Sequence, residues 1–374
     1  MLISRSDRSK KAIWFWTIDR WIFTSFLVLC SFGAFFIMAS GTKIAAKLNF
    51  NTHFFTLRHF LFLLSGFLIA LFLSNLNHKK IKILSIFGLI ISFIFMLFTF
   101  TDGISAKGAQ RWVIFFGQSI QPSEFIKPFF IIVNAWLLHL WKNNENFKGW
   151  LWSMLVIIPI IFLLLVQPDI GMTLLITLTW GFQLFLTGIP LIILLIVIFL
   201  IPLILLFSYL NYEHVFYRIN RFLEGNTFQT EQATKAFENG SLIGKGIGEG
   251  FFKNILPDAH TDFIFAVIAE EFGIILCCGI LLLYGIIIFR SLLIVFSENN
   301  LFIILSVCGL SFVFGIQSII HISSNLALIP TKGMTLPFLS YGGSSTLSSA
   351  IIIGMILSLT RKQIDLEPYQ QKFN

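Results

Sequence analysis

The chain has 374 residues, of which 56% are hydrophobic and 12% are charged, and its mean hydropathy is +0.87. Soluble globular domains carry about 25% charged residues, so this composition excludes a soluble protein and any large soluble domain. At about 20 apolar residues per crossing, the length predicts about ten transmembrane helices. The basic residues behind the net charge of +8 are scattered between apolar segments, which indicates membrane topology and not nucleic-acid binding.

The apolar stretches predict an all-α integral membrane protein. In chain order, the expected spans cover 21–39, 60–74, 83–100, 125–141, 149–166, 170–187, 190–210, 272–289, 301–323 and 345–360. Gln167-Pro168-Asp169 predicts a tight turn, and Gly188-Ile189-Pro190 predicts a break between two helices. The basic N-terminal residues are followed by no cleavage signal, so we expect the first span to be retained.

The distribution of Lys and Arg predicts that both termini are cytoplasmic. An even number of spans puts the termini on one side, and this orientation leaves 14 basic residues inside and 12 outside. Five of the outer residues lie in the long segment 211–260, which the positive-inside rule underweights, and without it the count is 14 against 7. We therefore expect cytoplasmic tails at 1–20 and 361–374, and a transmembrane domain at 21–360 that contains a large extracytoplasmic loop at 211–260.

This long loop is rich in acidic residues and glycine. Nine of the 18 acidic residues lie between Glu213 and Glu271, and five glycines lie between Gly240 and Gly250. No phosphate-binding GKS/T sequence follows these glycines. We interpret the segment as a flexible loop that covers a substrate.

Ionisable residues at the ends of membrane spans are costly and are therefore candidates for function. In the first cluster, Ser123 could cap a helix, and Glu124 could pair with Lys127 three residues later. The alternative is that Arg111 and Lys127 bind an anionic headgroup near a helix N-terminus. Trp112 also fits an interfacial anchor.

Two further carboxylate clusters follow. Asp169 most simply caps the helix after it, although it could also line a cavity. Thr261 or Asp262 could likewise cap the eighth helix, but capping does not explain the carboxylates of Glu270 and Glu271 deeper in that helix. We therefore favour a functional interpretation of the third cluster.

The last two clusters lie between the ninth and tenth spans. Lys332 stands alone between uncharged stretches, where a Lys that snorkels to the interface is the common case. The small residues of 337–345 permit close helix approach, with hydroxyls such as that of Ser340 available to a headgroup.

Five motifs, in this order along nearly the whole chain, resemble those of the SEDS family of bacterial membrane proteins, typified by FtsW and RodA. They are Gly-Ala-Gln-Arg-Trp at 108–112, Gln-Pro-Ser-Glu at 121–124, Gln-Pro-Asp-Ile-Gly at 167–171, His-Thr-Asp-Phe-Ile-Phe-Ala at 260–266 and Ser-Tyr-Gly-Gly-Ser-Ser at 340–345. Within the family, Leu-Pro-Asp-Ala-His at 256–260 and Pro-Thr-Lys-Gly-Met-Thr-Leu-Pro at 330–337 look like the FtsW branch.

The resemblance implies a peptidoglycan glycosyltransferase of the inner membrane that polymerises lipid II at the division septum. Its implied partners are a class B penicillin-binding protein, an FtsI-like transpeptidase, and other division proteins. The family's catalytic carboxylate falls on Asp262, and its substrate-site positions fall on Arg111, Trp112 and Lys332. We expect the rest of the substrate site to come from Gln121, Glu124, Lys127, His260 and Ser340.

The chemistry of the reaction is compatible with one carboxylate. The acceptor hydroxyl needs a base, whereas polyprenyl pyrophosphate is already a good leaving group, so inverting transfer needs no carboxylic acid. Lys332, Arg111 or a divalent cation, Mg²⁺ or Mn²⁺, could offset the charge on the departing pyrophosphate, although the sequence has no metal-ligand spacing. The alternatives are a lipid II flippase, an elongation-type polymerase like RodA, and a recruiter for which Asp262 is dispensable.

Overall fold

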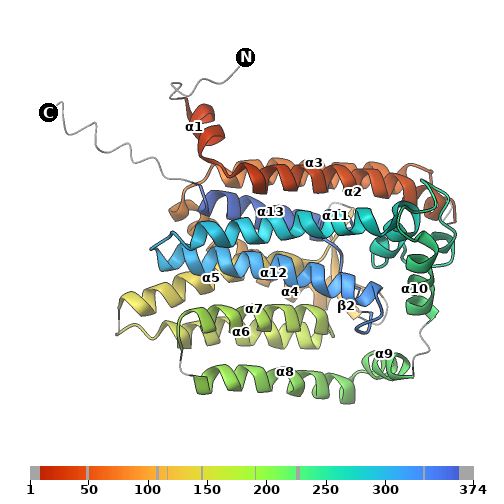
Figure 1. Cartoon of the computed structure of the whole chain (residues 1–374). Coiled ribbons are helices and arrows are strands. Elements are labelled where there is room, and N and C mark those ends of the chain that lie inside the picture. The colour runs from red at the N-terminus through yellow and green to blue at the C-terminus, as the bar shows by residue number, and fades with distance from the viewer. Residues whose placement is uncertain are drawn as a thin grey trace.

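The computed structural model is a bundle of long helices that run side by side (Figure 1). It describes residues 9–47, 50–106, 109–115, 117–144, 146–189, 191–224, 228–331 and 333–361. The helices are α1 (Lys10–Thr17), α2 (Arg20–Lys47), α3 (Phe54–Ser74), α4 (His78–Asp102), α5 (Pro122–Asn143), α6 (Gly149–Val166), α7 (Ile170–Leu186), α8 (Leu191–Asn211), α9 (Glu213–Leu223), α10 (Phe228–Gly240), α11 (Ile264–Val295), α12 (Leu301–Asn325) and α13 (Gly343–Leu359). The short 3-10 helix η1 (Phe252–Asn254) precedes α11.

Each of the ten predicted spans overlaps one of these helices, and the prediction of a helical membrane protein is confirmed. Seven helices in the described part of the chain are long and apolar enough to cross a membrane, namely α2 to α6, α11 and α12. Shorter apolar helices at Ile170–Leu186, Pro202–Asn211 and Gly343–Leu359 correspond to the other three predicted spans.

The predicted helix breaks lie where local chemistry stops a helix. Asp169 is the N-cap of α7, and its Oδ1 accepts from the Met172 N–H at 3.3 Å, which confirms its expected capping role. The other end of α7 is followed by Gly188 at φ +66°, a left-handed conformation that suits glycine, and the Gly188 N–H donates to the Phe185 carbonyl at 3.0 Å.

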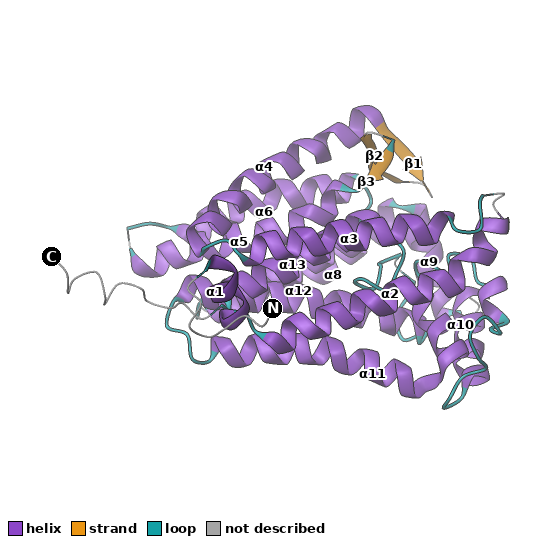
Figure 2. Cartoon of the chain, turned by 90° about the horizontal axis from the view of Figure 1, so that it is seen from above, coloured by secondary structure: helices purple, strands orange, loops and turns teal. Residues whose placement is uncertain are grey.

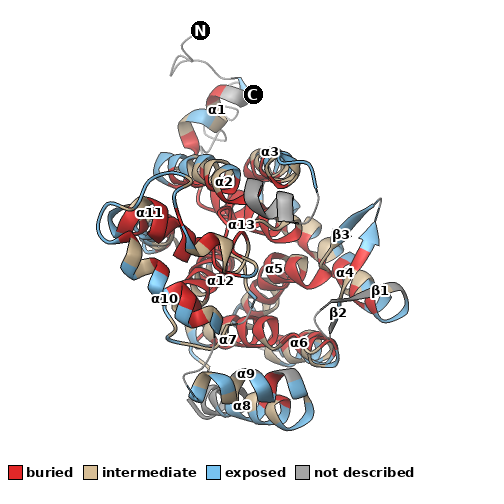
Figure 3. Cartoon of the chain, turned by 90° about the vertical axis from the view of Figure 1, so that its right-hand side faces the viewer, coloured by how far each residue is buried: buried red, intermediate tan, exposed pale blue. Residues whose placement is uncertain are grey.

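Helices α5 and α12 form the centre of the bundle (Figure 3). In their most apolar stretches 67% and 72% of the residues are buried, against 28% in the outer helices α3 and α4. The outer helices turn large apolar side chains such as Leu68 and Phe87 outward. An exposed apolar belt of this kind is expected where lipid, and not water, is the solvent.

A small antiparallel sheet departs from the all-α prediction. Strands β1 (Gly103–Ala106), β2 (Ala109–Phe115) and β3 (Gln118–Ile120) pair in the order β1-β2-β3, with Val113 opposite both Gly103 and Ile120. Gly117, at φ +74°, forms the turn between β2 and β3. The sheet lies at the same end of the bundle as α9 and α10 (Figure 2).

The long segment 211–260 is more structured than the predicted loop, because it contains α9, α10 and η1. Helix α11 also begins earlier than expected, at Ile264 instead of residue 272, and it is interrupted at Gly273, where φ is +82° and ψ is 172°. The stretch 264–272 therefore forms a separate helical piece before the predicted span, and this piece positions the candidate site.

Candidate active site

Asp262 lies in a tight turn just before α11, at the end of the bundle that carries α9 and α10. The N–H groups of Thr261 and Asp262 both donate to the Asp258 carbonyl at 3.0 Å. The N-cap position of α11 is Phe263, so neither Thr261 nor Asp262 caps the helix as the simplest interpretation supposed. Asp262 is half-buried, so part of the residue remains accessible.

Gly333 lies directly beside this carboxylate. Its φ is +63°, and a Cβ at this position would lie 3.4 Å from Oδ2 of Asp262. The backbone of the segment that follows α12 therefore passes close to Asp262, and a side chain at position 333 would contact the carboxylate. Lys332 lies outside the described residues, so its role in binding substrate stays a prediction.

The segment 333–341 is fixed from several sides. His321 Nδ1 donates to the Met334 carbonyl at 2.7 Å, Gln317 Nε2 donates to the Thr335 carbonyl at 3.0 Å, and the Tyr284 hydroxyl donates to the Pro337 carbonyl at 2.6 Å. These donors all come from the membrane helices α11 and α12. The segment beside Asp262 is thereby anchored to the bundle.

Ser340 and His260, which were predicted to bind substrate, both support the turn that carries Asp262. The Ser340 hydroxyl is buried, donates to the Thr261 carbonyl at 2.7 Å and accepts from the Leu336 N–H at 2.8 Å. The His260 ring packs 4.8 Å from Phe55 and 5.5 Å from Tyr341 between ring centroids. Both residues therefore support the turn, and their roles in substrate binding stay predictions.

Tyr341 belongs to the same aromatic cluster, because its ring packs against Phe55 and His260. Burial raises the pKa of Tyr341, and the charge of Arg58 offsets part of the rise. The phenol is therefore neutral at physiological pH and adds no charge next to the turn.

Arg111 lies on β2 and binds the turn before α7. Its Nε donates to the Gln167 carbonyl at 3.2 Å, a second guanidinium nitrogen donates to the Pro168 carbonyl, and a third lies 3.7 Å from Oδ1 of Asp169. The acidic partner of Arg111 comes from a distant part of the chain, so the sequence did not reveal it. Trp112, the next residue of β2, is half-buried.

Arg111 and Asp169 form the polar wall of a pocket of about 270 Å³. The remaining walls come mainly from apolar residues of α7, α8, α9 and the segment after α12, namely Pro168, Ile170, Gly171, Leu174, Leu205, Val215, Ile219, Ile329, Pro330 and Thr331. Polar groups on one wall and apolar residues on the others suit an amphiphile. Thr331 is two residues before Gly333, a span of about 7 Å at full extension, so the pocket and Asp262 flank the same short segment.

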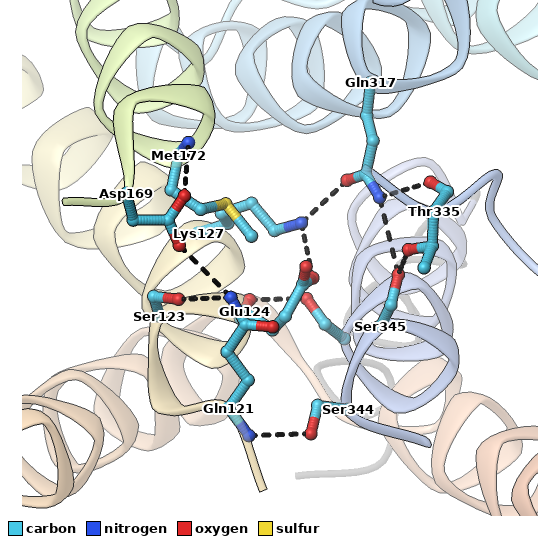
Figure 4. Close-up of polar contacts among 11 residues, drawn as sticks. Gln121, Ser123, Glu124, Lys127, Asp169, Met172, Gln317, Thr335, Ser344 and Ser345 are labelled. Carbon is cyan, nitrogen blue, oxygen red and sulfur yellow. Dashed lines mark hydrogen bonds and ion pairs between the residues drawn. The ribbon is translucent and has the colours of Figure 1, made fainter. Parts of the chain in front are cut away.

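Gln121, at the start of α5, binds Asp169 of the pocket wall, and Figure 4 shows this contact. Its side-chain nitrogen donates to the Ser123 hydroxyl at 3.1 Å and to Oδ2 of Asp169 at 3.2 Å, and its backbone N–H donates to the Ser344 hydroxyl at 2.9 Å. Gln121, and not Ser123, is the N-cap of α5, so the expected capping by Ser123 is wrong.

Glu124 and Lys127 form a buried ion pair inside the bundle. Lys127 Nζ lies 2.6 Å from Glu124 Oε2 and donates to Gln317 Oε1 at 2.7 Å (Figure 4). The Lys127 side chain is fully buried, and the Ser348 hydroxyl donates to the Glu124 carbonyl at 2.6 Å. The pairing interpretation is confirmed, and substrate binding by Glu124 and Lys127 stays a prediction.

Glu270 and Glu271 hold the long loop against α11, which gives these two carboxylates a structural role, while the functional interpretation stays a prediction. Glu270 accepts from the N–H groups of Phe251 at 2.8 Å and Phe252 at 3.0 Å, and from the Asn239 amide at 2.9 Å. Glu271 forms a buried ion pair with Lys253. Burial of these charges is tolerated because each one is paired or hydrogen-bonded.

The glycines of the same loop permit its close approach to α11. A Cβ at Gly240 would lie 2.0 Å from the Ala269 carbonyl oxygen, and one at Gly244 would lie 2.3 Å from that of Glu271. The close approach also lets the N–H of Ile274 donate to the Ser241 carbonyl at 3.1 Å. This bond satisfies a backbone N–H that the interruption at Gly273 leaves without a partner inside the helix. Gly240 and Gly244 are thus explained by backbone packing.

A divalent cation finds no obvious ligand set among these groups. Within the ranges that the structure describes, no group of three or more His, Cys, Asp or Glu side chains converges. The suggested role of Mg²⁺ or Mn²⁺ stays a prediction.

The fold and the site define a multi-span membrane protein with a half-buried carboxylate and an arginine-lined amphiphilic pocket at one end. The family described as "Cell cycle protein", which comprises FtsW, RodA and SpoVE, matches residues 19–364. The chain belongs to this FtsW/RodA/SpoVE family.

Individual relatives agree with this membership. The chain is 35% identical to the probable peptidoglycan glycosyltransferase FtsW of Caulobacter vibrioides over 96% of its own length and 93% of the relative. It is 32% identical to the protein of the same name from Coxiella burnetii, over 94% and 98% of the two chains.

Solved structures share the fold. One is a peptidoglycan synthase complex described as coordinating polymerization and crosslinking, with a TM-score of 0.73 and 22% identity over 92% of this chain and 97% of that one. Another is the rod shape determining protein RodA of Thermus thermophilus, with a TM-score of 0.69 and 23% identity over 93% and 98% of the two chains.

Proposed function

We propose that the protein is a peptidoglycan glycosyltransferase that polymerises lipid II into glycan strands at the division septum. Family membership and the names of its relatives support the class of reaction. The observation that carries the proposal for this chain is the Asp262 carboxylate, which is half-buried on a fixed turn beside Gly333 and one short segment away from the Arg111 pocket.

In the proposed reaction Asp262 is the general base. Its carboxylate takes the proton from the acceptor sugar hydroxyl, whose oxygen forms the new bond to the anomeric carbon of the donor. The bond from that carbon to the pyrophosphate breaks on the opposite face, and the polyprenyl pyrophosphate leaves with the electron pair, so the configuration inverts. The proton ends on Asp262 and passes to water.

Arg111 and Lys332 bind the pyrophosphate in this scheme. The Arg111 guanidinium lines the pocket while Asp169 and two backbone carbonyls hold it in place, so its charge is oriented before substrate arrives. Oriented cations stabilise the charge that develops on a leaving group. The apolar walls from α7, α8 and α9 would receive the first isoprene units of the lipid.

The orientation in the membrane follows from the same proposal. Lipid II is consumed outside the cytoplasm, so the end with Asp262, α9 and α10 faces outward and both termini are cytoplasmic, in agreement with the distribution of Lys and Arg. The crosslinking partner is a class B penicillin-binding protein, supported by the shared fold with a synthase complex that combines polymerization and crosslinking.

A flippase would need headgroup contacts along the bundle. Halfway along α5, the Asn134 side chain donates to Gln183 Oε1 at 2.8 Å. Its amide oxygen accepts from the Ser153 hydroxyl, and that hydroxyl accepts from Trp180 Nε1 at 2.6 Å. These buried polar groups bind one another, which favours polymerisation at the outer end over transport through the bundle.

The test is strand synthesis by purified protein. The full chain and its class B partner are reconstituted in liposomes with fluorescent lipid II, and products are separated by size after the transpeptidase is blocked with a β-lactam. We expect glycan strands that lysozyme degrades. Transfer of lipid II between leaflets without any strand would instead support the flippase.

A further inference from the structure

Three successive carbonyls of the turn that carries Asp262 bind donors from other parts of the chain. The His260 carbonyl accepts from the Tyr341 N–H at 2.9 Å, and the Thr261 carbonyl accepts from the Ser340 hydroxyl at 2.7 Å. The carbonyl of Asp262 itself accepts from Nδ2 of Asn325 at 2.9 Å. Of these contacts, the one from Asn325 acts directly on the residue that bears the carboxylate.

Asn325 is the last residue of α12, and its side chain is fully buried. Besides the Asp262 carbonyl, Nδ2 donates to the His321 carbonyl at 2.9 Å, and Oδ1 accepts from the Ala266 N–H at 3.2 Å. Both amide hydrogens and the amide oxygen are therefore used, which fixes the orientation of the group.

The bond to Ala266 replaces a missing helix cap. The N-cap residue of α11 is Phe263, whose side chain cannot accept a hydrogen bond, and Ala266 is at the N3 position that a capping side chain normally satisfies. The Ala266 N–H also faces the Phe263 carbonyl at 3.1 Å, so Asn325 supplements this contact from another helix. One amide thus connects Asp262 to the first turn of α11.

The same face of α12 also binds the segment that lies on the other side of the Asp262 carboxylate. Gln317, His321 and Asn325 follow each other at intervals of four residues and so form one stripe along the helix. Gln317 and His321 bind the carbonyls of Thr335 and Met334, next to the glycine that flanks Asp262. A single helix face therefore sets the distance between Asp262 and the segment opposite it.

We propose that Asn325 is a positioning residue for the reaction, which holds the Asp262 carboxylate at its working distance from the acceptor hydroxyl. The inference rests on the proposed role of Asp262 as the base. Because a misplacement of about 1 Å can cost about 100-fold in rate, loss of the amide should act on turnover and not on substrate binding.

The test compares two Asn325 variants with a matched buried asparagine. Asn325→Ala removes the amide, Asn325→Asp keeps the shape and one acceptor, and Asn134→Ala removes a buried, hydrogen-bonded amide from α5. Each full-length variant is reconstituted with the partner, its folding is checked by thermal unfolding, and strand synthesis is measured against lipid II concentration and pH.

We expect Asn325→Ala to lower kcat by about 10- to 100-fold with KM within about twofold of wild type, while Asn134→Ala keeps kcat. Asn325→Asp should also lower kcat, because a carboxyl group cannot donate to both the Asp262 and the His321 carbonyls.

Several results would overturn the inference. One is a wild-type kcat and pH profile in both folded Asn325 variants. Another is an equal loss of kcat in Asn134→Ala. The third is failure of both Asn325 variants to fold, which would assign the residue to stability. Wild-type activity of Asp262→Asn is a separate outcome, which would remove the proposed base itself.

Discussion

The Arg111 guanidinium lies 3.7 Å from the Asp169 carboxylate, which joins strand β2 to the N-cap of α7. The two residues stand in different motifs of the sequence, and the structure brings them to one wall of the amphiphilic pocket. The Arg111 side chain keeps 24% of its surface exposed, so its charge still reaches the pocket.

This geometry predicts that Arg111→Ala weakens the use of lipid II. Hydrogen bonds to charged groups contribute about 1.5–3 kcal/mol, so the lipid II concentration at half-maximal rate should rise about 10- to 100-fold. Arg290→Ala is the control, because Arg290 pairs with Asp19 at 2.8 Å and has no place in this pocket. Unchanged kinetics in Arg111→Ala, or an equal change in both variants, would remove Arg111 from the substrate site.

The buried pair of Glu271 and Lys253 predicts a large effect on stability. Their side chains are 0% and 1% exposed, and removal of one partner of a buried pair costs about 3–5 kcal/mol. Glu271→Ala should therefore lower the free energy of unfolding in detergent by that amount. Glu231→Ala, which breaks a pair exposed by 58% and 47%, should change it by less than about 1 kcal/mol. Similar losses in both variants would contradict the assignment.

The interruption of α11 at Gly273 predicts that a substitution there loosens the packing of the loop 240–254. A Cβ at Gly273 would lie 2.2 Å from the Leu242 carbonyl oxygen, and the backbone conformation there costs a non-glycine residue about 1–3 kcal/mol. In Gly273→Ala, limited proteolysis should cleave 240–254 faster than in wild type. Gly279→Ala, in the same helix with open space around it, should be cleaved at the wild-type rate. Equal protection of both variants would show that the loop does not depend on the interruption.

The spans and their breaks were predictable because they depend on local sequence. Apolar length marks a crossing, and the turn at Gln167-Pro168-Asp169 and the stop at Gly188 follow from the conformational limits of proline and glycine and from capping by Asp169. The pairing of Glu124 with Lys127 was likewise visible, as an interaction over one helical turn.

The sheet and the roles of the acidic pairs were not predictable in this way. Strands of three to seven residues between two apolar helices resemble an ordinary connection, although Trp112 and the apolar residues after it favour a strand. Glu270 and Glu271 suggested function because capping does not explain carboxylates deeper in the helix, whereas the interruption at Gly273 and the packing of 240–254 give them partners distant in sequence. The trans cap from Asn325 depends equally on tertiary contact.

The most direct test of the account is strand synthesis by Asp262→Asn protein that folds and binds its partner. Loss of a general base typically lowers the rate by about 100- to 10,000-fold, and we expect at least a 100-fold loss of turnover with the affinity for lipid II retained. The control is Glu249→Gln, which neutralises an exposed carboxylate of the long segment 211–260 and should keep the wild-type rate. Polymerisation of lipid II by Asp262→Asn at the wild-type rate would contradict the proposed mechanism.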